Sequence, residues 1–285
     1  MTQYRLPYQL QRMTRADMGT ALQWAEREGW NPGRHDADIF HPIDVRGHFM
    51  AWLDQRPVAS ISGLRYGTSH GFIGLYIVEP DLRGQGLGLA VWRAALEHLR
   101  GCIVGLDGVV EQQNNYRRSG FDLAWHNRRY QALGRSPQPR DPHIVKLASL
   151  PFEALAAYDR AFQPEPRPVF LQAWIQQRHS MALGWWQDGR LKGYGVVRAC
   201  AKGHKIGPLC ADTPAIADAL LDALLGCVLL REPVYLDVPE PNREAIALAE
   251  RHGMVQGFPT ARMYRGPAPR LDLGRCYALT ALEVG

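Results

Sequence analysis

Apolar residues in the first half of the chain form short runs separated by polar and glycine-rich turns. Residues 48–53, 57–64 and 72–78 are predicted as strands, and residues 103–107 form a further short apolar strand. Residues 89–99 place apolar side chains at helical spacing and are predicted as an amphipathic helix. The strand at 72–78 therefore leads through a short glycine-rich turn into a helix.

The second half repeats this order of elements weakly. A hairpin is expected around the turn Asp188-Gly189, followed by a strand at 206–212 and a helix at 214–230. The later elements expected are a strand at 234–237 that echoes 104–107, a helical segment at 242–254, and a terminal strand at 275–284. The chain thus reads as two copies of one arrangement.

A break between the copies is marked by proline and glycine. Residues 133–142 hold three prolines, a glycine and a serine, which cannot sustain a helix or a central strand. A chain of 285 residues also suits two medium domains better than one large core. We therefore predict a first domain over residues 1–133, a linker over 134–142 and a second domain over 143–285.

The turn before the helix at 89–99 has the composition of an anion cradle. It reads Arg83-Gly84-Gln85-Gly86-Leu87-Gly88. Glycines let consecutive backbone amides converge, and a helix N-terminus adds partial positive charge. Arg83 could add further donors for phosphate oxygens. The pattern lacks the Lys and Ser/Thr of a nucleotide-binding P-loop and misses the dinucleotide spacing, so a phosphate or pyrophosphate of another ligand is predicted here.

Two motifs in this half resemble the GNAT acetyltransferase superfamily. Arg83-x-x-Gly86-x-Gly88 resembles its first signature, and Tyr116-x-x-x-Gly120-Phe121 resembles its second. The resemblance covers roughly residues 5 to 132. It implies that the glycine loop binds the pyrophosphate of acetyl-coenzyme A. The cofactor-binding residues that it implies are Ile77, Val78, Arg83, Gly84, Gln85, Gly86, Leu87, Gly88 and Asn115.

The resemblance also implies a fold class, and the two copies differ in the residues that would bind the cofactor. We expect an α/β (α+β) protein of two GNAT-like domains, each a mixed, mainly antiparallel sheet flanked by helices. In the second copy the glycine loop is replaced by residues 210–214, where Asp212 would repel a pyrophosphate and Pro214 has no amide to offer. Ala249 stands where Tyr116 stands in the first copy. We expect that the second domain has lost cofactor binding and completes or covers the acceptor pocket of the first.

Tyr116 is the candidate catalytic residue. The resemblance implies that it projects toward the coenzyme A sulfur, and a phenol with an ordinary pKa of about 10 is protonated at neutral pH. It could therefore donate a proton to the departing thiolate. The general base stays open between Glu79, Asp107 and a water relay. Asp107 also recurs as Asp237 in the second copy, which favours a structural role.

The acceptor is expected to bind near residues 28–38, which combine turn formers with a tryptophan, a histidine and acidic side chains. Trp30, Asn31 and Asp107 are the predicted substrate-binding residues, although this segment could equally be a packed helix connection. The predicted function is acetyl transfer to a primary amine, on a small molecule, by direct attack in a ternary complex. A non-catalytic acyl-coenzyme A sensor or interaction protein, and an enzyme acting on protein amino groups, remain as alternatives.

Composition and charge decide which partners, metals and cellular location are expected. The net charge of +5 comes from arginines that are mostly spread singly, so nucleic acid is not an expected partner. The five cysteines form no CxxC pair, and no metal is expected. No apolar run has membrane-spanning length and no signal-peptide core follows Met1, so a cytoplasmic protein without a membrane partner is predicted. The sequence leaves a homodimer open.

Overall fold

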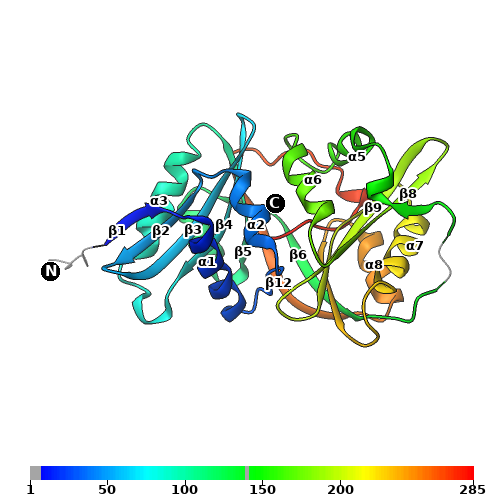
Figure 1. Ribbon diagram of the computed structural model, residues 1–285. Helices are drawn as coiled ribbons and strands as arrows, with labels where there is room; N and C mark the ends of the chain where they lie inside the picture. The colour runs from blue at the N-terminus through cyan, green and yellow to red at the C-terminus, as the bar shows by residue number, and fades with distance from the viewer. Residues whose placement is uncertain (1–7, 139–140) are drawn as a thin grey trace.

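The computed structural model describes residues 8–138 and 141–285. Two α/β halves lie side by side in it, and the C-terminus lies between them (Figure 1). Residues 1–7 of the predicted first domain and residues 139–140 of the predicted linker lie outside the described part of the chain.

The order of elements follows the predicted repeat. The first half contains β1 (Gln9–Arg12), α1 (Arg15–Arg27), α2 (Asp36–Phe40), β2 (His48–Leu53), β3 (Arg56–Tyr66), β4 (His70–Val78), α3 (Leu87–His98), β5 (Ile103–Val109), α4 (Gln113–Arg118) and β6 (Asp122–Leu133). The second contains β7 (Ile144–Lys146), α5 (Phe152–Asp159), α6 (Pro168–Gln176), β8 (Ser180–Gln187), β9 (Arg190–Ala199), β10 (His204–Ala211), α7 (Pro214–Leu225), β11 (Pro233–Pro239), α8 (Arg243–Arg251), β12 (Val255–Arg265) and β13 (Cys276–Ala278). Short 3-10 helices at His41–Ile43, Pro80–Leu82, Val110–Gln112, Leu147–Ser149 and Leu273–Arg275 connect some of them.

The strands of both halves form one continuous sheet. Its order is β1-β2-β3-β4-β5-β12-β6-β11-β10-β9-β8-β7, with β13 paired to β10. All pairs are antiparallel except β4 with β5 and β10 with β11. This confirms the predicted fold class, a mixed and largely antiparallel α/β arrangement flanked by helices.

The sheet is continuous because the halves exchange a strand, which the sequence analysis did not foresee. Strand β12 belongs to the second half by sequence but lies between β5 and β6. Strand β6 in turn pairs with β11 of the second half from Asn127 to Leu133. The side chains of Ala261 and Met263 complete the apolar core behind α3. In space, each half therefore borrows a long strand from the other.

The two exchanged strands, β6 and β12, each follow a helix that ends at a glycine. Helices α4 and α8 each end before a glycine with left-handed backbone, Gly120 at φ 83° and Gly253 at φ 64°. Glycine adopts this conformation without a side-chain clash, so it ends the helix and turns the chain into a strand. Helix α3 covers one face of the first half, α7 covers the equivalent face of the second, and α1, α2, α5 and α6 share one apolar core on the opposite face.

The terminal strand predicted at 275–284 is only partly present. Residues Cys276–Ala278 form β13, and the chain then leaves the second half and lies against the first. The Tyr66 hydroxyl donates a hydrogen bond of 2.7 Å to the Val284 carbonyl. The polypeptide can pass β4 closely because Gly74 has no side chain, and a Cβ there would lie 1.9 Å from the Glu283 carbonyl oxygen.

Candidate active site

A cavity of about 520 Å³ opens where β4 and β5 separate. Their parallel pairing ends at Ile73 and Leu106, although β4 continues to Val78 and β5 to Val109. Beyond that point the two strands diverge and expose their facing edges to the cavity. The remaining walls come from the glycine loop, from α4 and from the last residues of the chain.

A β-bulge shapes the β4 side of this opening. The register between β3 and β4 shifts between Ser60 and Ser62, so two residues of β4 oppose one of β3. Leu75 in the bulge has a left-handed φ of 49°, which is costly for a branched side chain. The buried Ser60 hydroxyl donates a 2.8 Å hydrogen bond to the Leu75 carbonyl and helps to hold this geometry. The bulge bends β4 away from β5.

The glycine loop has the predicted form of an anion cradle. Gly84 and Gly86 have φ values of 80° and 86°, and Gly86 is the N-cap of α3. A Cβ at either position would meet no atom within 4 Å, so both face open space. A Cβ at Gly88 would instead lie 2.5 Å from the Tyr76 hydroxyl. The loop therefore needs glycine for backbone conformation at its start and for close packing in the first turn of α3.

The Arg83 side chain, predicted to bind phosphate, contacts other residues of the protein. Its Nε donates to the Val78 carbonyl at 3.0 Å, and its guanidinium forms an ion pair with Glu28 just beyond α1. Arg83 still lines the cavity. In this arrangement it ties the loop to the end of β4 and to α1, and a phosphate would have to compete with Glu28 for it.

Tyr116 projects from α4 onto the cavity. Its ring stacks on Trp92 with centroids 5.7 Å apart, and it lies against the backbone of β5, where a Cβ at Gly108 would come within 2.3 Å of the ring. Burial, with a smaller contribution from Tyr76, raises the pKa of Tyr116 above its ordinary value of 10.0. The hydroxyl therefore stays protonated at neutral pH and can act as a proton donor.

The other predicted cofactor-binding residues divide into two groups. Those that line the cavity, besides Arg83, are Ile77, Val78, Gly84, Gly86 and Gly88. Gln85, Leu87 and Asn115 are not among the described residues that line it. The Gln85 amide donates to the Asp81 carbonyl at 3.3 Å, the Leu87 side chain is buried in the core, and the Asn115 amide donates to Gln112.

Asp107 lines the cavity, but its carboxylate is already engaged. Arg262 of β12 binds both of its oxygens, at 2.7 and 2.6 Å, and Asn127 donates to Oδ1 at 2.8 Å. The side chain of Asp107 is fully buried. A substrate would have to compete with these contacts, and the exchanged strand supplies the arginine from a part of the chain that the sequence could not locate. Glu79, the other candidate base, pairs with Arg27 at 2.8 Å and is not among the described cavity residues.

The two substrate-binding residues predicted in segment 28–38 lie in different surroundings. Trp30 lines the cavity, and its carbonyl accepts hydrogen bonds from Arg129 at 3.1 Å and from Lys205 at 2.9 Å. Asn31 points away from the cavity to the turn after β9, where its side chain exchanges two hydrogen bonds of 2.9 and 2.8 Å with the Lys202 backbone. Asn31 therefore joins the two halves.

The cavity residues that the sequence analysis missed include a carboxylate. Glu283 reaches the cavity from the last segment of the chain, with its side chain 3% exposed. Its Oε2 atom has no hydrogen-bond partner among the described residues. No motif marks this glutamate, and only the path of the chain after β13 brings it beside β4.

The corresponding opening in the second half is filled by the chain itself. Strands β10 and β11 pair in parallel only from His204 to Ile206, as β4 and β5 do before they separate. Strand β13 lies in the space that follows: it pairs with β10, and the Leu279 amide donates to the Asp237 carbonyl of β11 at 2.9 Å. At the helix start, the Thr213 hydroxyl caps α7 by accepting from the Ile216 amide.

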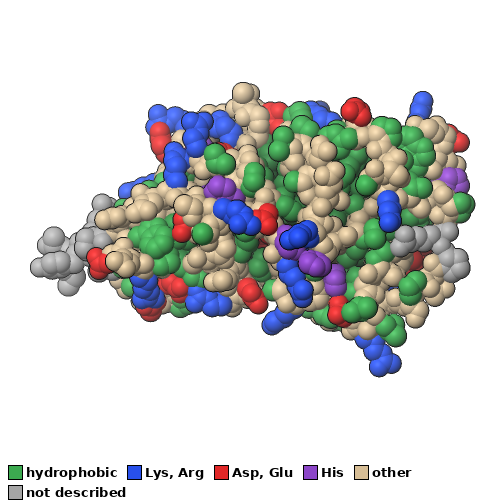
Figure 2. Space-filling model, viewed as in Figure 1, with side chains coloured by type: hydrophobic (Ala, Val, Ile, Leu, Met, Phe, Trp, Pro, Cys, Tyr) green, Lys and Arg blue, Asp and Glu red, His purple; other side chains and the backbone are tan. Residues whose placement is uncertain are grey.

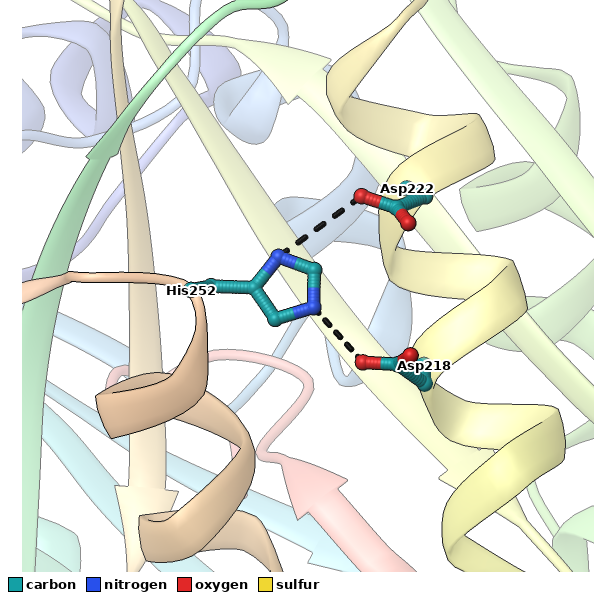
Figure 3. A group of neighbouring side chains, drawn as sticks. All are labelled: Asp218, Asp222 and His252. Carbon is teal, nitrogen blue, oxygen red and sulfur yellow. Dashed lines mark hydrogen bonds and ion pairs between the residues drawn. The ribbon is translucent and has the colours of Figure 1, made fainter. Parts of the chain in front are cut away.

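A group of two carboxylates and an imidazole lies on α7 and just beyond α8 (Figure 3). The ring of His252 sits between Asp218 and Asp222, with Nε2 2.6 Å from Asp218 and Nδ1 3.6 Å from Asp222. Each nitrogen faces a different carboxylate, and Arg135 pairs with Asp222 at 2.9 Å. These contacts link α7, the end of α8 and the linker.

Charged side chains on the face drawn in Figure 2 are dispersed over both halves, with acidic residues among the basic ones. In the described part of the chain, no helix combines the length and apolar character that crossing a membrane requires.

Comparisons with known proteins agree with this geometry. A model described as the acetyltransferase (GNAT) family matches residues 15–121, and a model of an acetyltransferase (GNAT) domain matches residues 155–278. A holothin acyltransferase from Pseudoalteromonas sp. (strain SANK 73390) is 29% identical over 265 residues, which cover 92% of this chain and 90% of that protein.

Solved structures show the same fold. The crystal structure of a putative acetyltransferase from Pyrococcus horikoshii has a TM-score of 0.83 and 23% identity, over 98% of this chain and 96% of that one. A tandem GNAT protein from the clavulanic acid biosynthesis pathway has a TM-score of 0.64 and 14% identity, over 92% of this chain and all (100%) of that one. With both halves matched by GNAT models, the chain is a two-domain transferase of the GNAT superfamily.

Proposed function

We propose that this protein transfers an acetyl group from acetyl-coenzyme A to the primary amine of a small molecule. The observation that carries the proposal is that the glycine loop and Tyr116 meet on one cavity. The loop offers amides to the anionic end of the donor, and Tyr116 offers a hydroxyl to its thioester end. The acyl transfer named for the holothin acyltransferase relative supports this class of reaction.

The described residues suit the donor. The first amides of α3 have no partner within the helix, and the space in front of Gly84 and Gly86 is open. These groups would hold the pyrophosphate, and the free edge of β4 from Leu75 to Val78 would run beside the pantetheine arm. A chain of amides in the donor can pair with an unpaired strand edge as another strand would.

The reaction would be a direct attack in a ternary complex. The nitrogen of the neutral amine attacks the thioester carbonyl carbon, so that a C–N bond forms and the C–S bond breaks. The nitrogen loses one proton, and the sulfur gains one from Tyr116, which then recovers it from solvent. The products are an amide and the free thiol, and the protons balance.

A small acceptor is favoured by the walls of the cavity. Trp30, Phe258 and Leu282 provide apolar and aromatic surface, and the last two come from the second half of the chain. The segment around Glu283 is buried against β4, which limits access for a polypeptide. An amine with an apolar or aromatic body fits these surroundings better than a lysine on a folded protein.

The test is thiol release from acetyl-coenzyme A with a panel of hexylamine, 2-phenylethylamine, tryptamine and a lysine-containing peptide. The Gly86→Asp variant places a carboxylate in the cradle. Gly101→Asp is a matched control because Gly101 has nearly the same φ, 85°, and also faces open space. We expect turnover of a small amine that Gly86→Asp loses and Gly101→Asp keeps. Binding without turnover of any amine would favour a sensor, and turnover of the peptide alone would favour a protein acceptor.

A further inference from the structure

The Glu283 carboxylate is a buried acid in the cavity with spare hydrogen-bonding capacity. Its side chain is 3% exposed, and Oε2 has no partner among the described residues. A buried carboxylate oxygen without a donor costs free energy that folding does not recover. Glu283 also lines the cavity, so a ligand there that brings its own N–H group would supply the missing donor.

The path of the chain brings this carboxylate close to β4. The chain leaves β13, passes the Asp237 carbonyl of β11 and then crosses to the first half. Gly74 admits the Glu283 backbone, and Tyr66 holds the following residue through the Val284 carbonyl. The same segment thus fills the opening between β10 and β11 and delivers an acid to the opening between β4 and β5.

The charged groups that face Glu283 leave Oε2 free. Lys205 of β10 lies 3.9 Å from Oε1, but its Nζ donates to the Trp30 carbonyl at 2.9 Å. Arg129 of β6 uses its donors on Asp237, at 2.7 and 2.8 Å, and on Trp30. Burial and the Arg129 charge lower the pKa of Lys205 from its ordinary 10.5.

Two more groups interact with Glu283 electrostatically: Arg198 of β9 and the Cys200 thiol. Arg198 pairs with Asp36 at 3.3 Å, which balances its charge inside the protein. None of these groups donates a hydrogen bond to Oε2.

We propose that Glu283 binds the acceptor amine and takes its proton during acyl transfer. This inference rests on the proposed function and names the base that the reaction needs. As the nitrogen forms its bond to the thioester carbonyl carbon, one N–H proton passes to a Glu283 oxygen. The C–S bond breaks, the sulfur takes the Tyr116 proton, and both side chains re-equilibrate with solvent. If the amine enters as an ammonium ion, one further proton is released to solvent before attack.

The carboxylates expected from the sequence cannot fill this role as well. Asp107 is held by Arg262 and Asn127, and Glu79 is paired with Arg27. Glu283 differs from both because it lines the cavity and keeps one oxygen unpartnered. The second half, without a cofactor loop of its own, would thus supply a catalytic residue to the first.

The experiment uses 2-phenylethylamine and the other amines of the panel with the full-length protein. Glu283→Gln keeps the size of the side chain and removes its ability to take a proton, and Glu283→Asp keeps the acid but shortens it. Glu250→Gln is the control, because Glu250 is an exposed carboxylate at the end of α8. Calorimetric binding of acetyl-coenzyme A, expected within twofold of wild type in all variants, verifies that each is folded.

We expect Glu283→Gln to lower kcat/KM for the best amine by about 100-fold at pH 7, a typical loss for a general base. Its rate should stay below that of wild type at every pH, since solvent supplies the neutral amine to both, whereas Glu250→Gln should follow wild type. Glu283→Asp should recover part of the rate. A Glu283→Gln variant with the rate and pH profile of wild type would overturn this inference alone. A wild-type protein that acetylates no amine would overturn the proposed function and this inference with it.

Discussion

Asp107 and Arg262 form a buried, two-pronged ion pair across the exchanged strand, with Nε–Oδ1 and Nη2–Oδ2 distances of 2.7 and 2.6 Å. Asp107 lies on β5 at the mouth of the cavity, and Arg262 comes from β12 of the second half. The guanidinium also lies over the rings of Phe72, at 5.0 Å, and Trp125, at 5.5 Å. The cavity wall and the strand exchange therefore depend on the same contact.

Breaking this pair should destabilise the whole chain. Arg262→Met leaves the Asp107 charge buried without its main partner, and we expect the free energy of unfolding to fall by about 3–5 kcal/mol. Arg56→Met is the control, because it breaks an exposed pair with Asp81 whose side chains are 54% and 56% accessible. Urea denaturation measures both. An Arg262→Met protein as stable as Arg56→Met would mean that the exchanged strand is held by its apolar contacts alone.

The role of the tyrosine can be separated from its packing. Tyr116→Phe keeps the ring that stacks on Trp92 and removes the hydroxyl. We expect kcat to fall by about 100-fold, because no proton donor remains for the thiolate, while the affinity for acetyl-coenzyme A stays unchanged. Tyr235→Phe on β11 is the matched control. A kcat for Tyr116→Phe within about twofold of wild type would exclude the general-acid role.

A buried histidine should make the fold sensitive to acid. Burial, with the neighbouring His41 charge, lowers the pKa of His48 from 6.5 to about 4. The unfolded chain accepts a proton at His48 that the folded protein excludes. The contribution of neutral His48 to the free energy of unfolding is therefore complete above pH 6.5 and is lost as the pH falls toward 4. The loss amounts to roughly 3 kcal/mol.

Urea denaturation between pH 7.5 and pH 4.5 measures this loss. His48→Asn should flatten the dependence of the unfolding free energy on pH across this window. His179→Asn replaces an exposed histidine with left-handed backbone, a conformation that asparagine tolerates, and should leave the slope unchanged. Equal slopes in wild type and His48→Asn would contradict the assignment.

Local patterns in the sequence were enough to predict the repeated order of strands and helices, the glycine loop and the position of Tyr116. These features depend on residues close together in the chain, such as Gly84 and Gly86 before α3. The strand exchange was not predicted, because no strand was expected at 255–265 and nothing local to Ala261 and Met263 shows which sheet receives them. Glu283 was missed for a similar reason: its place depends on the path of the chain after β13.

The predicted substrate-binding roles of Asp107 and Asn31 did not take account of long-range contacts. Asp107 lies 155 residues before Arg262, and Asn31 lies 171 residues before Lys202. A lone polar residue in a loop or at a strand end gives no sign of a partner so far along the chain. The contacts of the glycine loop are local, whereas those of Asp107 and Asn31 depend on the fold.

The most direct test of the account is the number of acetyl-coenzyme A molecules that one chain binds. Within residues 8–138 and 141–285, a glycine cradle lies beside an open cavity in the first half alone, and β13 fills the corresponding opening of the second. Isothermal titration calorimetry should therefore give one site per chain, lost in Gly86→Asp and kept in Gly101→Asp. Two sites per chain, or one site that survives Gly86→Asp, would contradict the account.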